Sequence, residues 1–290
     1  MIADARFLKQ PPAFWADVRT ISQAVGYTKR RKGEGRGKGE IRVPTLDDIK
    51  AKYKKRGLQF KHILDPTGAP TPLGQKLLDY FSFRAERLNS FAKPRLMDSK
   101  QARRLFEEHR ERLKPKCPSP MNKQKGKKKA PAYLTGLVNM LIDANSGSFP
   151  CDYDPRELTT VTRKGAPLRT LARRVDGAFP SAVDPIAVWE IKEYYYTTTF
   201  GSRVADGVYE TLLDGMELEE LREHEHVDVR HYLMVDGRVT WWRDGKSYLC
   251  RIVDILHMGY VDEVLFGHEV VERLPSIVKE WTVLARKRTA

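Results

Sequence analysis

The sequence predicts an α/β fold in which a mixed β-sheet is flanked by helices and follows a basic, mainly helical N-terminal region. Apolar residues recur at helical spacing through the first part of the chain, whereas the second part alternates strand and helix patterns. Charge divides at the same place: residues 1–130 carry 33 Lys and Arg against 13 Asp and Glu, and residues 131–290 carry 19 against 25. With 290 residues, 41% of them hydrophobic, the composition argues against a wholly disordered chain.

Four amphipathic patterns predict the helices of the N-terminal region. They cover Pro12–Val25, a segment from Thr45 to Arg56, Leu73–Asn89 and Ser99–Leu113. Thr45 precedes two acidic residues and is expected to cap its helix. Residues 114–131 are rich in Pro, Gly and Lys, which predicts a linker. We therefore expect two regions, 1–130 and 131–290.

The second region begins with a helix predicted for Tyr133–Ala144. Three strand patterns follow, a long helix comes next, and a further strand ends at an Asp-Gly turn. These elements are expected at Leu158–Thr162, Arg173–Phe179, Ala187–Tyr195, Arg203 to about His224, and Val229–Val235. The long helix has a predicted apolar stripe of Val204, Val208, Leu212, Met216 and Leu221. This order is typical of an α/β unit on a mixed sheet.

Several classes of protein are disfavoured by composition. No apolar run approaches the ~18 residues of a transmembrane helix, and the first residues lack the apolar core of a signal peptide. Cys117, Cys151 and Cys250 are far apart and form no C-x-x-C pair, which argues against a disulfide framework or a zinc finger. A cytoplasmic protein without membrane contact is expected.

The net charge of +14, with a pI near 9.6, indicates a polyanionic partner. The segment 26–39 combines five glycines with basic residues, so it cannot build a core. Two interpretations stay open for it, a solvated loop or a loop that contacts DNA phosphates. The basic residues concerned are Lys29, Arg30, Arg31, Lys32, Arg36 and Lys38.

Chemistry is concentrated around the strand predicted at Ala187–Tyr195. Side chains alternate along a strand, so Glu190 and Lys192 share one face, and the apolar residues between them predict burial. Asp176 lies fourteen residues before Glu190, on a strand that a short turn can return as an antiparallel neighbour. Two carboxylates and the exposed carbonyl of Ile191 suit Mg²⁺ better than zinc. The alternatives are a purely structural ion pair with Lys192, or Asp184 in place of Asp176.

These residues and their order resemble the PD-(D/E)XK nuclease superfamily, and type II restriction endonucleases in particular, over roughly residues 132–236. The resemblance implies a restriction-endonuclease-like core in which Asp176 and Glu190, with the Ile191 carbonyl, hold Mg²⁺ for phosphodiester hydrolysis. Lys192 then positions the attacking water and neutralises developing charge. Polar residues after the catalytic strand are expected to contact DNA: Thr197, Thr198, Thr199 and Arg203.

The sequence departs from the family pattern at two places. Val175 stands where the motif has proline, and the helix before the first strand offers Asn139 and Asp143 where many members carry glutamate. The identity of a third acidic metal ligand therefore stays open, and Asp143 is a better candidate than Glu157. Asp206 and Glu210 lie one turn apart on the long helix. Two interpretations stay open for them: they support the site, or they lie on the plain surface.

The function expected is that of a Mg²⁺-dependent, sequence-specific DNA endonuclease, a type II restriction enzyme of a restriction–modification system. Most such enzymes cut both strands of a palindrome, so the resemblance implies a homodimer bound to double-stranded DNA. A repair or junction nuclease of the same fold is an alternative. So is a non-catalytic nucleic-acid-binding protein with a degenerate nuclease core.

Overall fold

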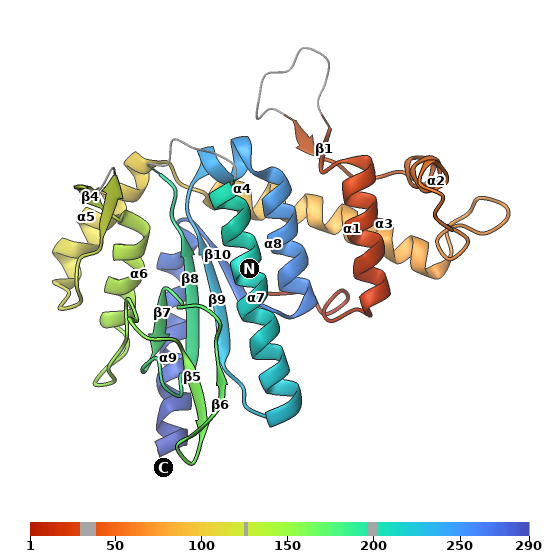
Figure 1. The fold of residues 1–290 in the computed structure, drawn as a ribbon. Coiled ribbons are helices and arrows are strands. Elements are labelled where there is room, and N and C mark those ends of the chain that lie inside the picture. Colours follow the sequence, from red (N-terminus) through yellow and green to blue (C-terminus); the bar gives the residue numbers. More distant parts are fainter. Residues whose placement is uncertain (30–38, 125–126, 196–201, 290) are drawn as a thin grey trace.

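The computed structural model describes residues 1–29, 39–124, 127–195 and 202–289. A four-stranded mixed sheet lies at its centre, in the order β10-β9-β8-β7 (Figure 1). Its strands are β7 (Gly177–Phe179), β8 (Ala187–Lys192), β9 (Arg230–Val235) and β10 (Glu263–Phe266). β7 runs antiparallel to β8, whereas β8, β9 and β10 are parallel. The predicted α/β fold with a mixed sheet is confirmed.

Parallel neighbours need crossover connections, which two helices provide. α7 (Ser202–Glu225) links β8 to β9, and α8 (Lys246–Met258) links β9 to β10. α7 matches its predicted range within a residue, but Met216 of the predicted stripe is 46% exposed, while Leu218 is buried. The apolar face of α7 is set by how the helix lies on the sheet, which spacing alone does not specify.

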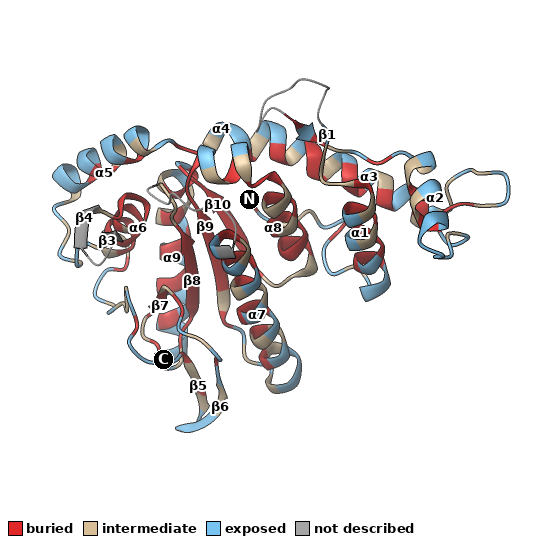
Figure 2. Ribbon diagram, turned by 45° about the horizontal axis from the view of Figure 1, so that its top comes forward, coloured by how far each residue is buried: buried red, intermediate tan, exposed pale blue. Residues whose placement is uncertain are grey.

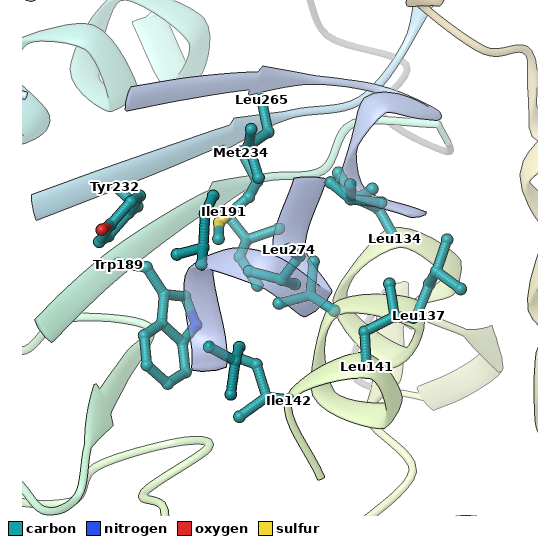
Figure 3. Packing of buried hydrophobic residues seen from close by; sticks show 14 of the residues in the cluster. Leu134, Leu137, Leu141, Ile142, Trp189, Ile191, Tyr232, Met234, Leu265 and Leu274 are labelled. Atoms are coloured by element: carbon teal, nitrogen blue, oxygen red, sulfur yellow. The ribbon is translucent and has the colours of Figure 1, made fainter. Parts of the chain in front are cut away.

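The other face of the sheet is covered by α6 (Tyr133–Asp143) and α9 (Glu269–Thr289), as Figure 3 shows for the buried side chains. Trp189 and Ile191 of β8 point into this cluster, and Trp189 stacks on Trp281 of α9 with ring centroids 5.5 Å apart. All six residues of β8 are buried. β8 is therefore buried on both faces, as predicted. Burial specifies the register of the strand, because a shift by one residue would exchange the side chains on its two faces.

The N-terminal region is mainly helical, as predicted. Its helices are α1 (Pro12–Val25), α2 (Leu46–Lys55), α3 (Pro72–Glu86), the short α4 (Lys93–Arg95) and α5 (Ser99–Leu113). Thr45 caps α2 by accepting a hydrogen bond from the Asp48 amide at 3.1 Å. The predicted helix 73–89 is an α-helix only to Glu86 and continues as a π-helical segment, η1 (Arg87–Ala92).

Three small antiparallel hairpins and a second π-helical segment complete the fold. They are β1 (Thr28–Lys29) with β2 (Glu40–Ile41), β3 (Met121–Gln124) with β4 (Lys127–Pro131), β5 (Thr160–Arg163) with β6 (Ala166–Thr170), and η2 (Arg238–Asp244). The predicted linker 114–131 therefore contains a hairpin. The strand predicted at 158–162 belongs to a separate sheet, and only the last three residues of the segment 173–179 form a strand. Leu171 N–H still donates to Thr159 O, which ties the approach to Asp176 to the small hairpin.

Contacts distant in sequence hold the N-terminal helices against the sheet region. Arg84 of α3 and Asp254 of α8 form a buried ion pair at 2.9 Å, and α5 packs on α6. Figure 2 shows buried residues running continuously from the central sheet into the inner faces of the N-terminal helices. Among the described residues, no helix is long and apolar enough to cross a membrane.

Candidate active site

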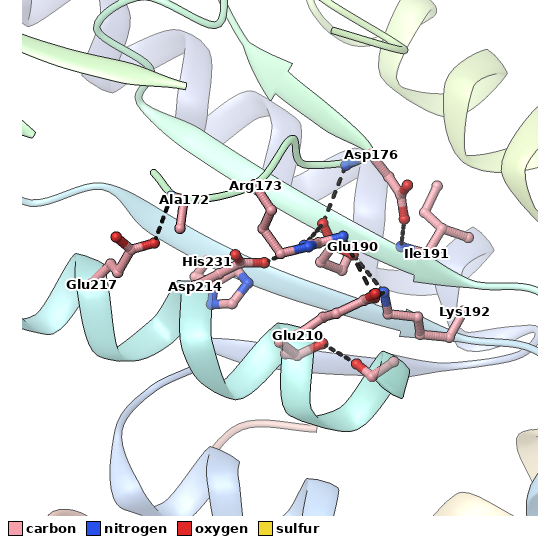
Figure 4. Close-up of polar contacts among 12 residues, drawn as sticks. Ala172, Arg173, Asp176, Glu190, Ile191, Lys192, Glu210, Asp214, Glu217 and His231 are labelled. Carbon is pink, nitrogen blue, oxygen red and sulfur yellow. Dashed lines mark hydrogen bonds and ion pairs between the residues drawn. The ribbon is translucent and has the colours of Figure 1, made fainter. Parts of the chain in front are cut away.

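Asp176 and Glu190 are brought together where β7 meets β8. Gly177 pairs with Trp189, so Asp176 stands opposite Glu190 by the same register. The Asp176 amide donates to a Glu190 carboxylate oxygen at 3.3 Å, and the Ile191 amide donates to Asp176 Oδ2 at 2.7 Å. The hairpin predicted from the sequence therefore brings the two carboxyl groups close together at β8 (Figure 4).

Two cationic side chains contact the buried carboxylate of Glu190. Lys192 Nζ lies 2.6 Å from Glu190 Oε2, and Arg173 donates to both Glu190 oxygens at 2.8 and 3.2 Å. Glu190 is fully buried and Lys192 is 6% exposed. An ion pair between Glu190 and Lys192, one of the alternatives drawn from the sequence, is thus present.

Helix α7 adds two further carboxyl groups to the cluster. Glu210 lies 2.9 Å from Lys192 Nζ, and Asp214 lies 2.5 Å from an Arg173 guanidinium nitrogen. Both come from the helix face that covers Glu190 and Lys192 (Figure 4). Four carboxyl groups therefore share two cations, and full ionisation would leave two negative charges uncompensated.

The carboxyl groups respond differently to this environment. Burial, with the nearby charge of Glu190, raises the pKa of Asp176 to about 6 and that of Asp214 to about 7. Burial also acts to raise the pKa of Glu190, but the charge of Lys192 and the hydrogen bonds from Arg173 outweigh it and lower that pKa. Near neutral pH, Glu190 is therefore more fully ionised than Asp176 or Asp214.

Lys192 keeps its proton in this setting. Burial acts to lower its pKa, but the charges of Glu190 and Asp176 raise it above the ordinary lysine value. Lys192 therefore offers a positive charge and N–H donors at neutral pH and does not act as a base in this arrangement.

The residues at this edge fit a divalent cation with oxygen ligands. Asp176 Oδ1 offers a hard oxygen donor, and the Ile191 carbonyl points to the same side as the Ile191 amide that bonds Asp176. Both Glu190 oxygens accept from Arg173, so Glu190 would exchange one of these contacts for the ion. The two excess negative charges match a divalent ion. Within the described part of the chain, no three His, Cys, Asp or Glu side chains form a ready-made metal cage, so the backbone carbonyl and water would complete the coordination.

Other acidic residues considered from the sequence lie elsewhere. α6 covers the opposite face of the sheet, and its Asp143 accepts a hydrogen bond from the Lys116 amide at 2.9 Å. Asp184 binds Thr162, accepting from its amide at 2.6 Å and its hydroxyl at 2.7 Å. Glu157 is exposed on the chain between α6 and β5. The structure thus groups Asp176, and not Asp184 or Asp143, with Glu190 and Lys192.

Most of the predicted DNA contacts lie outside the described residues. These are Arg30, Arg31, Lys32, Arg36, Lys38, Thr197, Thr198 and Thr199. Lys29 is exposed at the end of β1. Arg203 is exposed in the first turn of α7, where its carbonyl accepts a hydrogen bond from the Tyr194 hydroxyl at 3.0 Å. These contacts remain predictions.

Sequence reasoning missed Arg173 and Asp214 as members of the cluster. The sequence is consistent with Glu210 at the site or on the plain surface, and its contact with Lys192 places it at the site. Asp214 follows Glu210 by one helical turn, so the i, i+4 spacing carried a signal that the pair shares a face. The sequence pairs Glu210 with Asp206 equally well, because spacing alone does not show which turn lies over Lys192.

Residues 97–281 match the family described as a domain of unknown function (DUF7687), and residues 1–91 match a second such family (DUF7690). No curated protein and no solved structure is significantly similar to the chain. Residues 92–96, which contain the end of η1 and α4, lie between the two matched segments.

Proposed function

The chain belongs to the DUF7687 family, and we propose that it is a Mg²⁺-dependent endonuclease that hydrolyses phosphodiester bonds in double-stranded DNA. The observation that carries the proposal is the meeting of Asp176 and Glu190 across β7 and β8, with Lys192 on the same face as Glu190. Two carboxylates and a protonated amine at the edge of a sheet are suited to holding a metal ion and a phosphate together.

Each residue has a distinct task in this proposal. Asp176, Glu190 and the Ile191 carbonyl would hold Mg²⁺, which supplies Lewis acidity toward the phosphate and lowers the pKa of water. Lys192 orients the attacking water and stabilises the charge that develops on the phosphate. Glu210 contacts Lys192 and Arg173 contacts Glu190, so these two side chains fix the positions of the groups that act.

The finer parts of the proposal rest on the sequence. The basic region 1–130 would contact the DNA backbone, and a restriction-endonuclease-like core would cut it. Sequence specificity of the type II kind, a homodimer that cuts both strands, and a cytoplasmic location remain predictions.

Incubation with plasmid DNA and Mg²⁺ tests the activity directly. We expect the natural chain to cut the plasmid, and sequencing of the fragment ends then shows whether cleavage occurs at discrete sites. Asp176→Asn removes a ligand charge, and Lys192→Met removes the ammonium group with little change in volume. We expect each variant to lose about a hundredfold or more in cleavage rate.

Asp184→Asn provides the matched control, because Asp184 binds Thr162 away from the cluster. This variant should cut at the rate of the natural chain. Equal cleavage by Asp176→Asn and the natural chain would reject the assigned site. Binding of DNA without any cleavage would instead support the non-catalytic alternative.

A further inference from the structure

A cavity of about 300 Å³ is lined by residues of α1, α7 and α8. In Figure 1 these helices lie next to one another, with α8 in the middle. Asp176, Glu190 and Lys192 do not line the cavity, so it is separate from the candidate active site. The two sites are neighbours across α7, because Tyr209 lines the cavity and Glu210, the next residue, contacts Lys192. About one helix diameter, or about 10 Å, therefore separates them.

Arg251 of α8 brings a positive charge to this cavity and is held there by tyrosines. Its Nε donates to the Tyr27 hydroxyl at 3.3 Å, and its Nη1 donates to the Tyr209 hydroxyl at 3.1 Å. The guanidinium also lies 5.2 Å from the centre of the Tyr27 ring and 5.1 Å from that of Tyr248. Within the described part of the chain, no carboxylate forms an ion pair with Arg251. Its orientation is thus fixed by neutral groups, and its charge stays available for an anion.

The other polar groups of the cavity are mainly hydrogen-bond donors. The Tyr27 and Tyr209 hydroxyls accept from Arg251, which leaves each phenolic proton to be donated to a ligand. Arg19 of α1 also lines the cavity and is exposed. It contacts the Met258 sulfur at 3.4 Å, and no described carboxylate pairs with it. Donors that converge on one cavity without acceptors indicate an anionic ligand.

A carboxylate also lines the cavity, but its charge is already compensated. Both oxygens of Asp254 accept from Arg84, at 2.9 and 3.0 Å, and the Tyr80 hydroxyl donates to it at 2.6 Å. The Arg84 guanidinium in turn lies 5.8 Å from the centre of the Tyr27 ring. The described lining residues therefore present two cationic side chains and one carboxylate that a third cation neutralises. This balance attracts negative charge.

We propose that this cavity binds a phosphate group; that the phosphate belongs to the DNA backbone rests on the proposed function. Guanidinium N–H groups and hydroxyls are the side-chain donors that phosphate oxygens accept from. Val208, Leu212 and Ile255 add apolar wall surface for the attached sugar. The net charge of +14 favours a polyanion, and exposed Lys29 follows Tyr27 closely in the chain. A phosphate held here would lie about three base-pair steps of a duplex from the carboxyl cluster.

Fluorescence anisotropy of a short labelled DNA duplex, measured without Mg²⁺ at several salt concentrations, tests the site on the full chain. We expect Arg251→Gln to weaken binding about tenfold and to reduce the slope of log affinity against log salt by about 1. Arg19→Gln should act in the same direction. Because Arg19 is exposed, this variant keeps the test decisive even where Arg251→Gln does not fold.

Arg156→Gln is the matched control, because it removes the same charge from an exposed side chain that is already paired with Asp154 at 2.8 Å. It should keep the affinity and the salt slope of the natural chain. An equal loss in Arg156→Gln would reduce the effect to net charge and would overturn the site.

Inorganic phosphate and dTMP distinguish a free phosphate from the DNA backbone as the source. Unchanged duplex binding in the variants, with a thermal midpoint that either compound raises in the natural chain but not in Arg251→Gln or Arg19→Gln, would support the site with a free phosphate as its ligand. Duplex binding that depends on Arg251 and Arg19, without cleavage in Mg²⁺, would support the site and contradict the proposed function. Folded variants that bind the duplex as the natural chain does, with no response of the midpoint to either compound, would overturn the proposal whatever the cleavage result.

Discussion

At the scale of single residues, the protons on Asp176 and Asp214 compete with any cation for the same cluster. Burial raises the pKa of Asp176 to about 6 and that of Asp214 to about 7, because Lys192 and Arg173 compensate only part of the carboxylate charge. A raised carboxyl pKa means that the folded chain holds these protons more tightly than the unfolded chain. Their contribution to stability is present at low pH and is lost as the pH rises from about 4 to about 7.

Mg²⁺ binding is therefore expected to depend on pH in the opposite sense. The ion needs Asp176 ionised, so its affinity should be full above about pH 7 and fall by up to about tenfold per unit below about pH 6. The Mg²⁺-induced shift in the thermal midpoint, measured between about pH 5 and pH 8, checks this. Asp176→Asn should reduce the shift at every pH. An equal shift across the range would show that Mg²⁺ binds elsewhere.

At the scale of elements, the β7–β8 hairpin depends on Gly177, which follows Asp176 directly. Gly177 pairs with Trp189, and a Cβ at position 177 would lie 2.1 Å from the Trp189 ring. Trp189 cannot move away easily, because it stacks on Trp281 in the core between the sheet and α9. The glycine thus lets β7 approach β8 closely enough for Asp176 to stand beside Glu190.

Gly177→Ala should therefore destabilise the protein by about 1–3 kcal/mol through overpacking. Chemical denaturation measures this change. The double variant Gly177→Ala, Trp189→Phe should lose less stability than the two single changes together, because the smaller ring relieves the clash. Additive losses would show that the Trp189 ring does not limit position 177.

At the scale of the whole molecule, a buried ion pair joins the N-terminal helices to the sheet region. Arg84 of α3 contacts both oxygens of Asp254 on α8 at 2.9 and 3.0 Å, and the Tyr80 hydroxyl donates to Asp254 at 2.6 Å. Arg84 also donates to Ser22 of α1 at 3.2 Å. The pair links a segment that matches one family to a segment that matches another, so we expect it to couple their folding.

Arg84→Met should cost about 3–5 kcal/mol, because it leaves the Asp254 charge buried without its partner. The midpoint of chemical denaturation measures the loss. Arg104→Ala is the control, since Arg104 is exposed on α5 and its contact with Glu108 is 3.7 Å; it should change stability by less than about 0.5 kcal/mol. Two separate unfolding transitions in Arg84→Met would show that the pair maintains cooperativity, whereas an unchanged midpoint would contradict the coupling.

Much of the element structure followed from local pattern. The predicted bounds of α1 and α5 agree with the structure, because apolar spacing and capping residues act within a few turns. Alternation along β8 correctly put Glu190 and Lys192 on one face and Trp189 on the other. The sequence pattern was less informative where an element depends on partners distant in the chain. The Lys-rich segment before α6 forms a hairpin, and the strand at 160–163 pairs in a small separate sheet, not in the central one.

The sequence by itself determined the mixed α/β class, the basic N-terminal region, and the grouping of Asp176, Glu190 and Lys192. Alternation in strands and a short hairpin turn suffice for that grouping, because both are local. Only the tertiary structure decided that Glu210 and Asp214 join the cluster and that Asp143 contacts the Lys116 amide instead. Helical spacing tells which residues share a face, but the packing of each helix on the sheet decides what that face meets.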